Sequence, residues 1–259
     1  MINTTPVKRS NLCMLMIGGV LSLASTLGHA APASGSAEGE GSAQPISEGL
    51  STRQQAIIPI AAFAAAGDMT KLDNALSRGL DDGLTISDVR EVLVQLYAYA
   101  GFPRSLNALN ALMTVVEERK QDGIQDDLGR EPSRPIPTGD ALLDVGTANQ
   151  TKLVGQPVAG RLFEFAPAVD TYLKTHLFGD IFERDNLDWK TRELATVSFL
   201  SAVPGVESQL QSHMRMSMNV GLTSNQMRKV VQVLSEGVSG EYGQRANEAL
   251  DAVLDSSAG

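Results

Sequence analysis

The sequence predicts an all-α protein that is built as a duplicated helical bundle. Aromatic residues make up only 5% of the 259-residue chain, whereas the helix formers Ala, Leu and Met are abundant. An internal repeat is the second indication, because the segment 71–85 aligns with the segment 209–223. With 42% apolar residues, a chain of this length can bury one large core or two small ones.

Each repeat is predicted to contain three helices. The first helix covers 52–66 in one repeat and 191–203 in the other, where apolar residues recur at helical spacing. The second helix of each copy ends at the sequence GLT, at residues 83–85 and 221–223. The glycine suits the left-handed position after a helix, and the threonine can cap the third helix.

Two irregular stretches divide the chain. Residues 31–50 are rich in Gly, Ala, Ser and Glu without periodic apolar residues, which is typical of a flexible linker. The stretch 121–139 contains three prolines and separates the two halves. We therefore assign the first repeat to 51–120 and the second repeat to 140–255.

The first 30 residues have the order of a secretory signal peptide. Lys8 and Arg9 precede an apolar run at 12–27, which is too short to cross a membrane and leads to small residues. We expect cleavage after Ala30 or Ala33, a periplasmic or secreted protein, and no membrane attachment afterwards. The alternative is a retained membrane anchor. Cleavage removes the only cysteine and one of three histidines, and it changes the net charge from −9 to −11.

Charge and cysteine content exclude several classes of function. A net charge of −9 argues against a broad nucleic-acid-binding surface. A single cysteine, Cys13, supports neither a disulfide framework nor a thiolate metal site within one chain. We expect no metal and no other cofactor.

Several motifs, in the same order in both halves, resemble the carboxymuconolactone decarboxylase family. In the second repeat they are RELATVSFLSAV at 192–203 and HMRMSMNVGLT at 213–223. The first repeat resembles the family through GLDDGLTISDVREVLVQLYAYAGFPRSLNAL at 79–109, and FGDIFERDNLDWKTREL at 178–194 is similar to its lead-in segment. The resemblance covers roughly residues 50–250. It implies an all-helical, alkylhydroperoxidase D-like fold that assembles into homo-oligomers, as trimers or hexamers.

The family includes a decarboxylase branch and an alkylhydroperoxidase branch. The peroxidase branch uses the motif C-x-x-C-x-x-x-H, in which a thiolate attacks the peroxide and the second cysteine resolves it. If His213 is the motif histidine, Val206 and Gln209 stand at the two cysteine positions, and neither can form a thiolate. Hydroperoxide reduction by this mechanism is excluded once Cys13 is removed, although the family label can still suggest peroxiredoxin activity.

The decarboxylase branch needs no thiol, and the resemblance implies a small carboxylated lactone or related carboxylic acid as the ligand. Loss of CO2 leaves electron density that must be reprotonated, for which a histidine is suited near neutral pH. His213 is the candidate proton donor, and Glu193 is its candidate orienting partner. Arg184 and Arg192 are candidates for the substrate carboxylate, because a guanidinium group can bind a carboxylate with two hydrogen bonds.

Each of these residues has a structural alternative. His213 can be a core histidine bonded to a backbone carbonyl, and Glu193 can be an exposed first-turn acid favoured by the helix dipole. Surface arginines are common, so Arg184 and Arg192 can be ordinary. We expect Trp189 to pack rather than to stack on a ligand.

The first repeat has Ala75 in place of His213 and Gln54 in place of Glu193. We therefore expect it to be scaffold, with the aromatic segment 97–104 either packing or lining a pocket. The remaining histidine, His176, has no aligned acid, and we expect it to have no functional role.

Two function classes follow from the sequence. One is an exported decarboxylase-type enzyme, and the other is a non-catalytic oligomer that binds a ligand or serves a structural role. The observation that separates them is whether His213 and Glu193 meet in an open pocket or in a sealed core.

Overall fold

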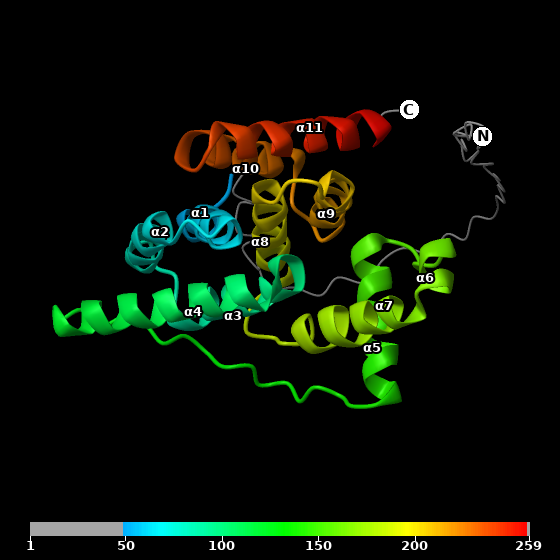
Figure 1. Cartoon of the computed structure of the whole chain (residues 1–259), viewed down its shortest axis with the longest axis horizontal. Coiled ribbons are helices and arrows are strands. Elements are labelled where there is room, and N and C mark those ends of the chain that lie inside the picture. Colours follow the sequence, from blue (N-terminus) through cyan, green and yellow to red (C-terminus); the bar gives the residue numbers. More distant parts are fainter. Residues whose placement is uncertain (1–48, 258–259) are drawn as a thin grey trace, which may run out of the picture. The chain divides into compact units, whose positions relative to one another are not determined.

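The computed structural model describes residues 49–257. The signal peptide predicted at 1–30 and all but the last two residues of the linker predicted at 31–50 lie outside this range. Every regular element in the described part is a helix, which confirms the all-α fold class (Figure 1). None of these helices combines the length and the apolar character needed to cross a membrane.

Two sets of four helices form most of the described structure. The first set is α1 (Thr52–Ala66), α2 (Met69–Asp81), α3 (Ile86–Gln95) and α4 (Tyr97–Gln121). The second set is α8 (Trp189–Ala202), α9 (Glu207–Asn219), α10 (Ser224–Gly237) and α11 (Gly240–Ser257). The first three helices of each set are those that the repeat predicted. The fourth helix of each set was not predicted. In α4 the kink at Gly101 and the following Pro103 resemble a helix end in the sequence.

The predicted signals between the second and third helices act as expected. Gly83 and Gly221 follow the second helices with φ angles of 89° and 97°, a conformation that glycine adopts without a steric penalty. Thr85 and Thr223 then cap α3 and α10, and each hydroxyl accepts a hydrogen bond from the backbone three residues later. Both caps are capping boxes, completed by the side chains at N3.

The first helices of the two repeats, α1 and α8, pack against each other in the middle of the bundle. In Figure 1, α10 and α11 lie above this pair and α3 and α4 lie below it. Both helices lack a distinct polar face, and most of their residues are buried. A helix without a polar face is stable only when neighbours surround it. The α1/α8 pair therefore forms the core on which the other helices pack.

The irregular segment between α4 and α5 is bound to the start of α3. The backbone N–H groups of Ile86 and Ser87 donate to the carbonyls of Asp127 and Leu128, at 2.9 and 3.0 Å. The first N–H groups of a helix have no partner within the helix. Because the segment supplies those partners, it completes the N-terminus of α3.

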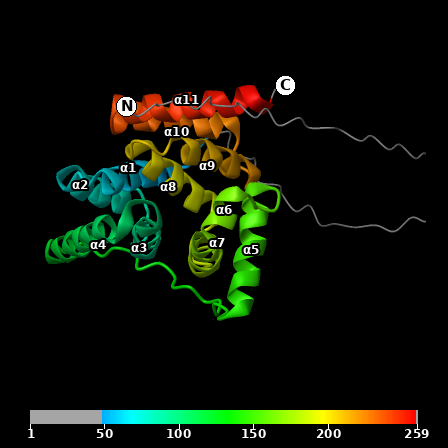
Figure 2. The same cartoon turned by 45° about the vertical axis from the view of Figure 1, so that its right-hand side comes forward.

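A second apolar cluster lies between the two repeats in the chain. It consists mainly of side chains from α5 (Asp140–Val154) and the π-helix η1 (Leu173–Ile181). The short helices α6 (Arg161–Phe165) and α7 (Pro167–Tyr172) connect these two elements along the chain and have no buried residue (Figure 2). The cluster's buried core comprises Leu153, Leu177, Phe178, Ile181 and Phe182. α5 crosses η1 closely at Gly146, where an added Cβ would stand 1.7 Å from the carbonyl oxygen of Lys174.

Gly146→Ala is expected to destabilise the protein, because the new methyl group would displace the backbone of η1. Overpacking of this kind typically costs about 1–3 kcal/mol, and a clash with backbone lies at the upper end. The matched control is Gly237→Ala at the exposed end of α10, where a Cβ would meet nothing within 4 Å. Urea unfolding of both variants is the measurement. Equal stability of the two variants would contradict the close approach of α5 and η1.

Candidate functional site

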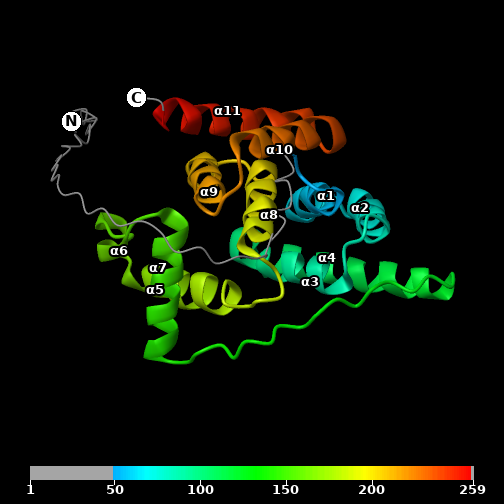
Figure 3. The ribbon, with the colours of Figure 1, turned by 180° about the vertical axis from the view of Figure 1, so that it is seen from behind.

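The structure brings His213 and Glu193 together. His213 lies on the buried face of α9, with Leu210 and Ser217, while Glu193 lies on the first turns of α8. The Nδ1 atom of His213 is 2.8 Å from the Oε2 atom of Glu193, and the two residues are 6% and 0% exposed. Figure 3 shows α8 and α9 side by side. Glu193 is therefore not an exposed acid, and the partner of His213 is a carboxylate rather than a backbone carbonyl.

The first repeat contributes to this pair through Tyr99. The Tyr99 ring meets the His213 ring edge-on, with 5.4 Å between the ring centres. Burial, and next the negative charge of Glu193, raise the pKa of Tyr99 above its ordinary value. The phenol therefore stays protonated at neutral pH. A residue of the aromatic segment 97–104 of the first repeat thus packs against the candidate pair.

Two polar atoms at the pair lack hydrogen-bond partners within the described residues. They are the Oε1 atom of Glu193 and the Oγ atom of Ser217. The hydroxyl of Tyr99, in contrast, lies within hydrogen-bonding reach of the Thr196 side chain. Ser217 lies one helical turn after His213 on α9. Buried polar atoms are nearly always paired with protein, ordered water or ligand. Their concentration here indicates a position that suits a small polar occupant.

The two candidate arginines do not bind the pair. Arg184 donates two hydrogen bonds to the buried carboxylate of Glu91 on α3, at 2.7 and 2.5 Å. The fully buried Arg192 lies 3.3 Å from the same carboxylate. In the described structure both guanidinium groups neutralise Glu91 instead of forming a free carboxylate-binding site near His213.

Glu91 is the residue at the centre of this buried cluster, and the sequence reasoning missed it. The available signal was an acidic residue within the apolar pattern of a predicted helix. The aligned residue in the second repeat is Lys229, so the repeat gave no further indication. Burial acts to raise the pKa of Glu91, but the hydrogen bond and charge of Arg184 and the charge of Arg192 outweigh it. The pKa of Glu91 consequently lies below its ordinary value of 4.5.

A further set of hydrogen bonds fixes α3 against α8. The amide nitrogen of Gln95 donates to the backbone oxygen of Arg192 and to the hydroxyl of Thr196, at 3.0 and 2.8 Å. The amide oxygen of Gln95 accepts from the guanidinium group of Arg192, at 3.2 Å. These contacts join the third helix of the first repeat to the first helix of the second.

His176 and Trp189 lie in other surroundings. His176 is exposed on η1, and its Nδ1 atom is 2.7 Å from the carboxylate of Asp180 one turn later, so it does have an acidic partner. Trp189 packs edge-on against Phe182 and donates its indole N–H to the Phe182 carbonyl. Trp189 therefore packs against Phe182, and whether it also contacts a ligand stays a prediction.

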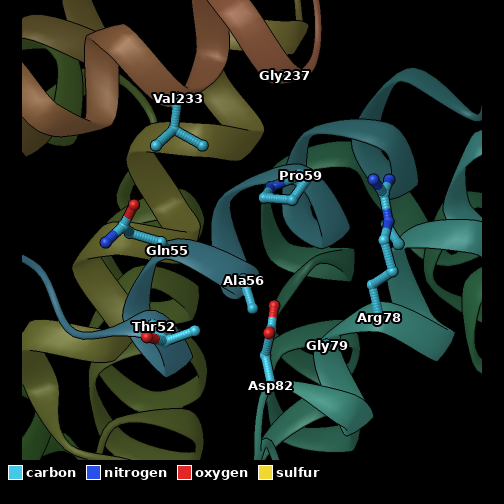
Figure 4. A pocket seen from close by; sticks show the side chains of 10 residues that line it. Thr52, Gln55, Ala56, Pro59, Arg78, Gly79, Asp82, Val233 and Gly237 are labelled. Atoms are coloured by element: carbon cyan, nitrogen blue, oxygen red, sulfur yellow. The ribbon is translucent and has the colours of Figure 1, made fainter.

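Five surface hollows in the described part of the chain lie away from the His213–Glu193 pair. Neither residue lines any of these five hollows. One of about 320 Å³ lies between α1, α2 and α10, with Arg78 and Asp82 on one side and Val233 above (Figure 4). It contains neither a histidine nor a nucleophilic pair. Within residues 49–257, no group of three or more His, Cys, Asp or Glu side chains is arranged to hold a metal ion.

The helical fold and its duplication agree with a comparison against sequence models of protein families. The model described as the carboxymuconolactone decarboxylase family matches residues 37–113 and 167–255. The chain belongs to the carboxymuconolactone decarboxylase family. The two matches together span more than half of the chain and correspond to its two repeats. A search of curated proteins gives no match.

The carboxymuconolactone decarboxylase match leaves out the segment 114–166. This segment contains the end of α4, the irregular connection, α5 and all of α6. The whole of α5 therefore lies outside the regions that the family model matches.

Glu91→Gln is expected to lower the free energy of unfolding at pH 7 by about 3 kcal/mol, because it leaves two guanidinium groups without their carboxylate. Since the folded-state pKa of Glu91 is lowered, its contribution is present above pH 4.5 and is lost as the pH falls through the folded-state pKa. The variant should lack this acid-sensitive contribution. Urea unfolding between pH 7 and pH 3 measures both effects.

The control for this prediction is Glu131→Gln, which removes the exposed partner of Arg90. Exposed ion pairs contribute less than about 1 kcal/mol, so this variant should unfold almost like the unchanged protein. A Glu91→Gln protein that matches the control at both pH values would contradict the proposed role of the buried cluster.

Proposed function

We propose that this protein is an acid–base enzyme of the decarboxylase type that acts on a small carboxylated lactone or a related carboxylic acid. The observation that carries the proposal is the buried His213–Glu193 pair with two unpartnered polar atoms, Glu193 Oε1 and Ser217 Oγ. A pair needed only for packing would be expected to have its polar neighbours satisfied. Family membership supports the reaction class.

The geometry assigns separate tasks to the two nitrogens of His213. Its Nδ1 atom is bonded to Glu193, so a carboxylate there keeps a proton on Nδ1 and fixes the orientation of the ring. The other ring nitrogen, Nε2, is then the atom that exchanges a proton with a ligand. The hydroxyls of Tyr99 and Ser217 can donate hydrogen bonds to oxygen atoms of that ligand.

The proposed step breaks the carbon–carbon bond to the substrate carboxylate and releases CO2. The bonding electron pair moves into the conjugated framework of the substrate. The protonated imidazole of His213 delivers its Nε2 proton to the electron-rich carbon, and the neutral ring regains a proton from water. Glu193 holds the Nδ1 side of the ring by its hydrogen bond throughout.

The second candidate function is a non-catalytic oligomer that binds a ligand or has a structural role. The low exposure of the pair, and its absence from the walls of the five hollows, favours this alternative. The two functions differ in whether the mature protein releases CO2 from any substrate and whether that release depends on His213.

His213→Gln is expected to lower turnover by at least about 100-fold with only a small change in melting temperature. The glutamine amide can still donate to Glu193 but cannot transfer a proton, and general acid–base catalysis contributes about 10²–10⁴-fold. Glu193→Gln should lower turnover less and shift the pH profile. The measurements are CO2 release from a panel of small carboxylated lactones and a melting curve for each variant.

His176→Gln is the matched control, since it removes the other described imidazole, which is exposed and paired with Asp180. It should leave turnover unchanged. Normal turnover by a folded His213→Gln protein would overturn the catalytic assignment. If the unchanged protein releases no CO2 from any member of the panel, the non-catalytic alternative is favoured.

We also propose that the mature protein is periplasmic or secreted and forms a homo-oligomer. Large apolar side chains that are exposed on α4, α6 and α7 support assembly; they include Phe102, Leu106, Met113, Phe165 and Tyr172. Cleavage after Ala30 or Ala33 would remove Cys13, the only thiol.

The mature protein is therefore expected to be thiol-free and oligomeric. Intact-mass measurement and thiol labelling of exported material test the cleavage, and light scattering of the same sample tests the assembly. A labelled thiol in the exported protein would contradict signal cleavage, and a monomeric mass would contradict oligomerisation.

A further inference from the structure

A hollow of about 540 Å³ lies where the end of α5 meets the start of α8 and the end of α9. Its walls are Lys152, Asp188, Trp189, Lys190, Asn219 and Val220. The volume falls in the range of small-molecule sites, which is roughly 300–1,000 Å³. The hollow combines two ammonium groups, an indole and an aliphatic side chain.

The two lysines of this hollow have no acidic partner. Lys71 and Lys174 form ion pairs with Asp68 and Asp170, whereas Lys152 and Lys190 form none within the described residues. The ammonium group of Lys152 lies 4.6 Å from the centre of the Trp189 ring. The side chain of Lys190 packs over Gly221, since a Cβ added to Gly221 would stand 3.2 Å from the Nζ atom of Lys190.

The other polar groups in the walls are already engaged. Asp188 caps α8, and its two carboxylate oxygens accept hydrogen bonds from the backbone N–H and the hydroxyl of Thr191. The amide nitrogen of Asn219 donates to the carbonyls of Leu153 and Val154, both at 3.0 Å. The lining therefore carries a net charge of about +1, and its unpaired charges are the two ammonium groups.

The apolar cluster beside the hollow also includes a residue of α9 near His213. Trp189 and Val220 pack against the same apolar cluster as Met216, which lies between His213 and Val220 in the chain. Val220 lies seven positions after His213, a rise of about 10 Å along the helix axis. The hollow is thus a separate position on the same two helices.

We propose that this hollow binds a small aromatic monocarboxylate. Lys152 and Lys190 bind the carboxylate, and Trp189 and Val220 contact the ring. One negative charge on the ligand balances the net charge of the walls, and desolvation beside an indole strengthens a charge pair. Lys152 belongs to the segment that the family match leaves out, whereas the other wall residues lie within the match 167–255. This inference does not depend on chemistry at His213.

The single tryptophan of the chain makes the test direct, because all indole fluorescence comes from the wall of the hollow. The full-length chain is titrated at constant ionic strength with benzoate, with benzamide, which has the ring without the charge, and with acetate, which has the charge without the ring. Benzoate is expected to give a saturable fluorescence change. Benzamide and acetate are each expected to bind at least about tenfold more weakly.

Lys152→Met and Lys190→Met should each weaken benzoate binding about three- to tenfold, and the double variant should weaken it further. The matched control is Lys120→Met, which removes the same charge from an exposed position at the end of α4. His213→Gln should bind benzoate like the unchanged protein, so failure of the decarboxylase proposal leaves this result unaffected.

Three results would overturn the proposal. The first is the absence of a saturable change up to about 10 mM benzoate, which corresponds to binding weaker than about 3 kcal/mol. The second is equal binding of benzamide or acetate, which would remove the need for the carboxylate or the ring. The third is loss of benzoate binding in His213→Gln but not in the lysine variants, which would place the ligand at the pair instead.

Discussion

The ion pairing of the buried Glu91 carboxylate with two arginines is the interaction that fixes the two repeats against each other. Glu91 lies on α3, and both of its guanidinium partners, Arg184 and Arg192, come from the second half of the chain. Arg192 directly precedes Glu193 on α8, so fixing the guanidinium group on one side of the helix fixes the direction of its neighbour. Because α8 cannot rotate without breaking this cluster, the Glu193 carboxylate is held where α9 presents His213.

The candidate site therefore needs both copies of the duplicated unit. The second copy supplies His213 and Glu193, and the first copy supplies Tyr99 at the start of α4. In the first copy, Gln54 stands at the position of Glu193 and completes the capping box of α1 with Ser51. At the equivalent position, the first repeat thus has a glutamine that caps a helix, and the second repeat has a glutamate that contacts His213. The described part of the duplicated fold consequently has the His–Glu pair in its second repeat alone.

The segment outside the two family matches supplies one wall residue of the proposed aromatic monocarboxylate site. α5 packs on η1 through the close approach at Gly146 and brings Lys152 against Trp189. The chain has a net charge of −9, whereas the walls of this hollow, with two lysines that have no acidic partner in the described structure, carry a net positive charge. The proposed aromatic monocarboxylate site and the proposed decarboxylase site consequently depend on different parts of the sequence, and they can be tested separately.

The sequence by itself determined the helical class, the duplication, the first three helices of each repeat and the turns between them. These features depend on local chemistry, such as the left-handed glycines 83 and 221 and the capping boxes at Thr85 and Thr223. It also identified His213 and Glu193 as partners through the family resemblance. Only the tertiary structure decided that Arg184 and Arg192 neutralise Glu91 and that Tyr99 meets His213. Those contacts join residues about 90 to 115 positions apart, and helical periodicity shows which side of a helix is buried but not which side chain lies opposite.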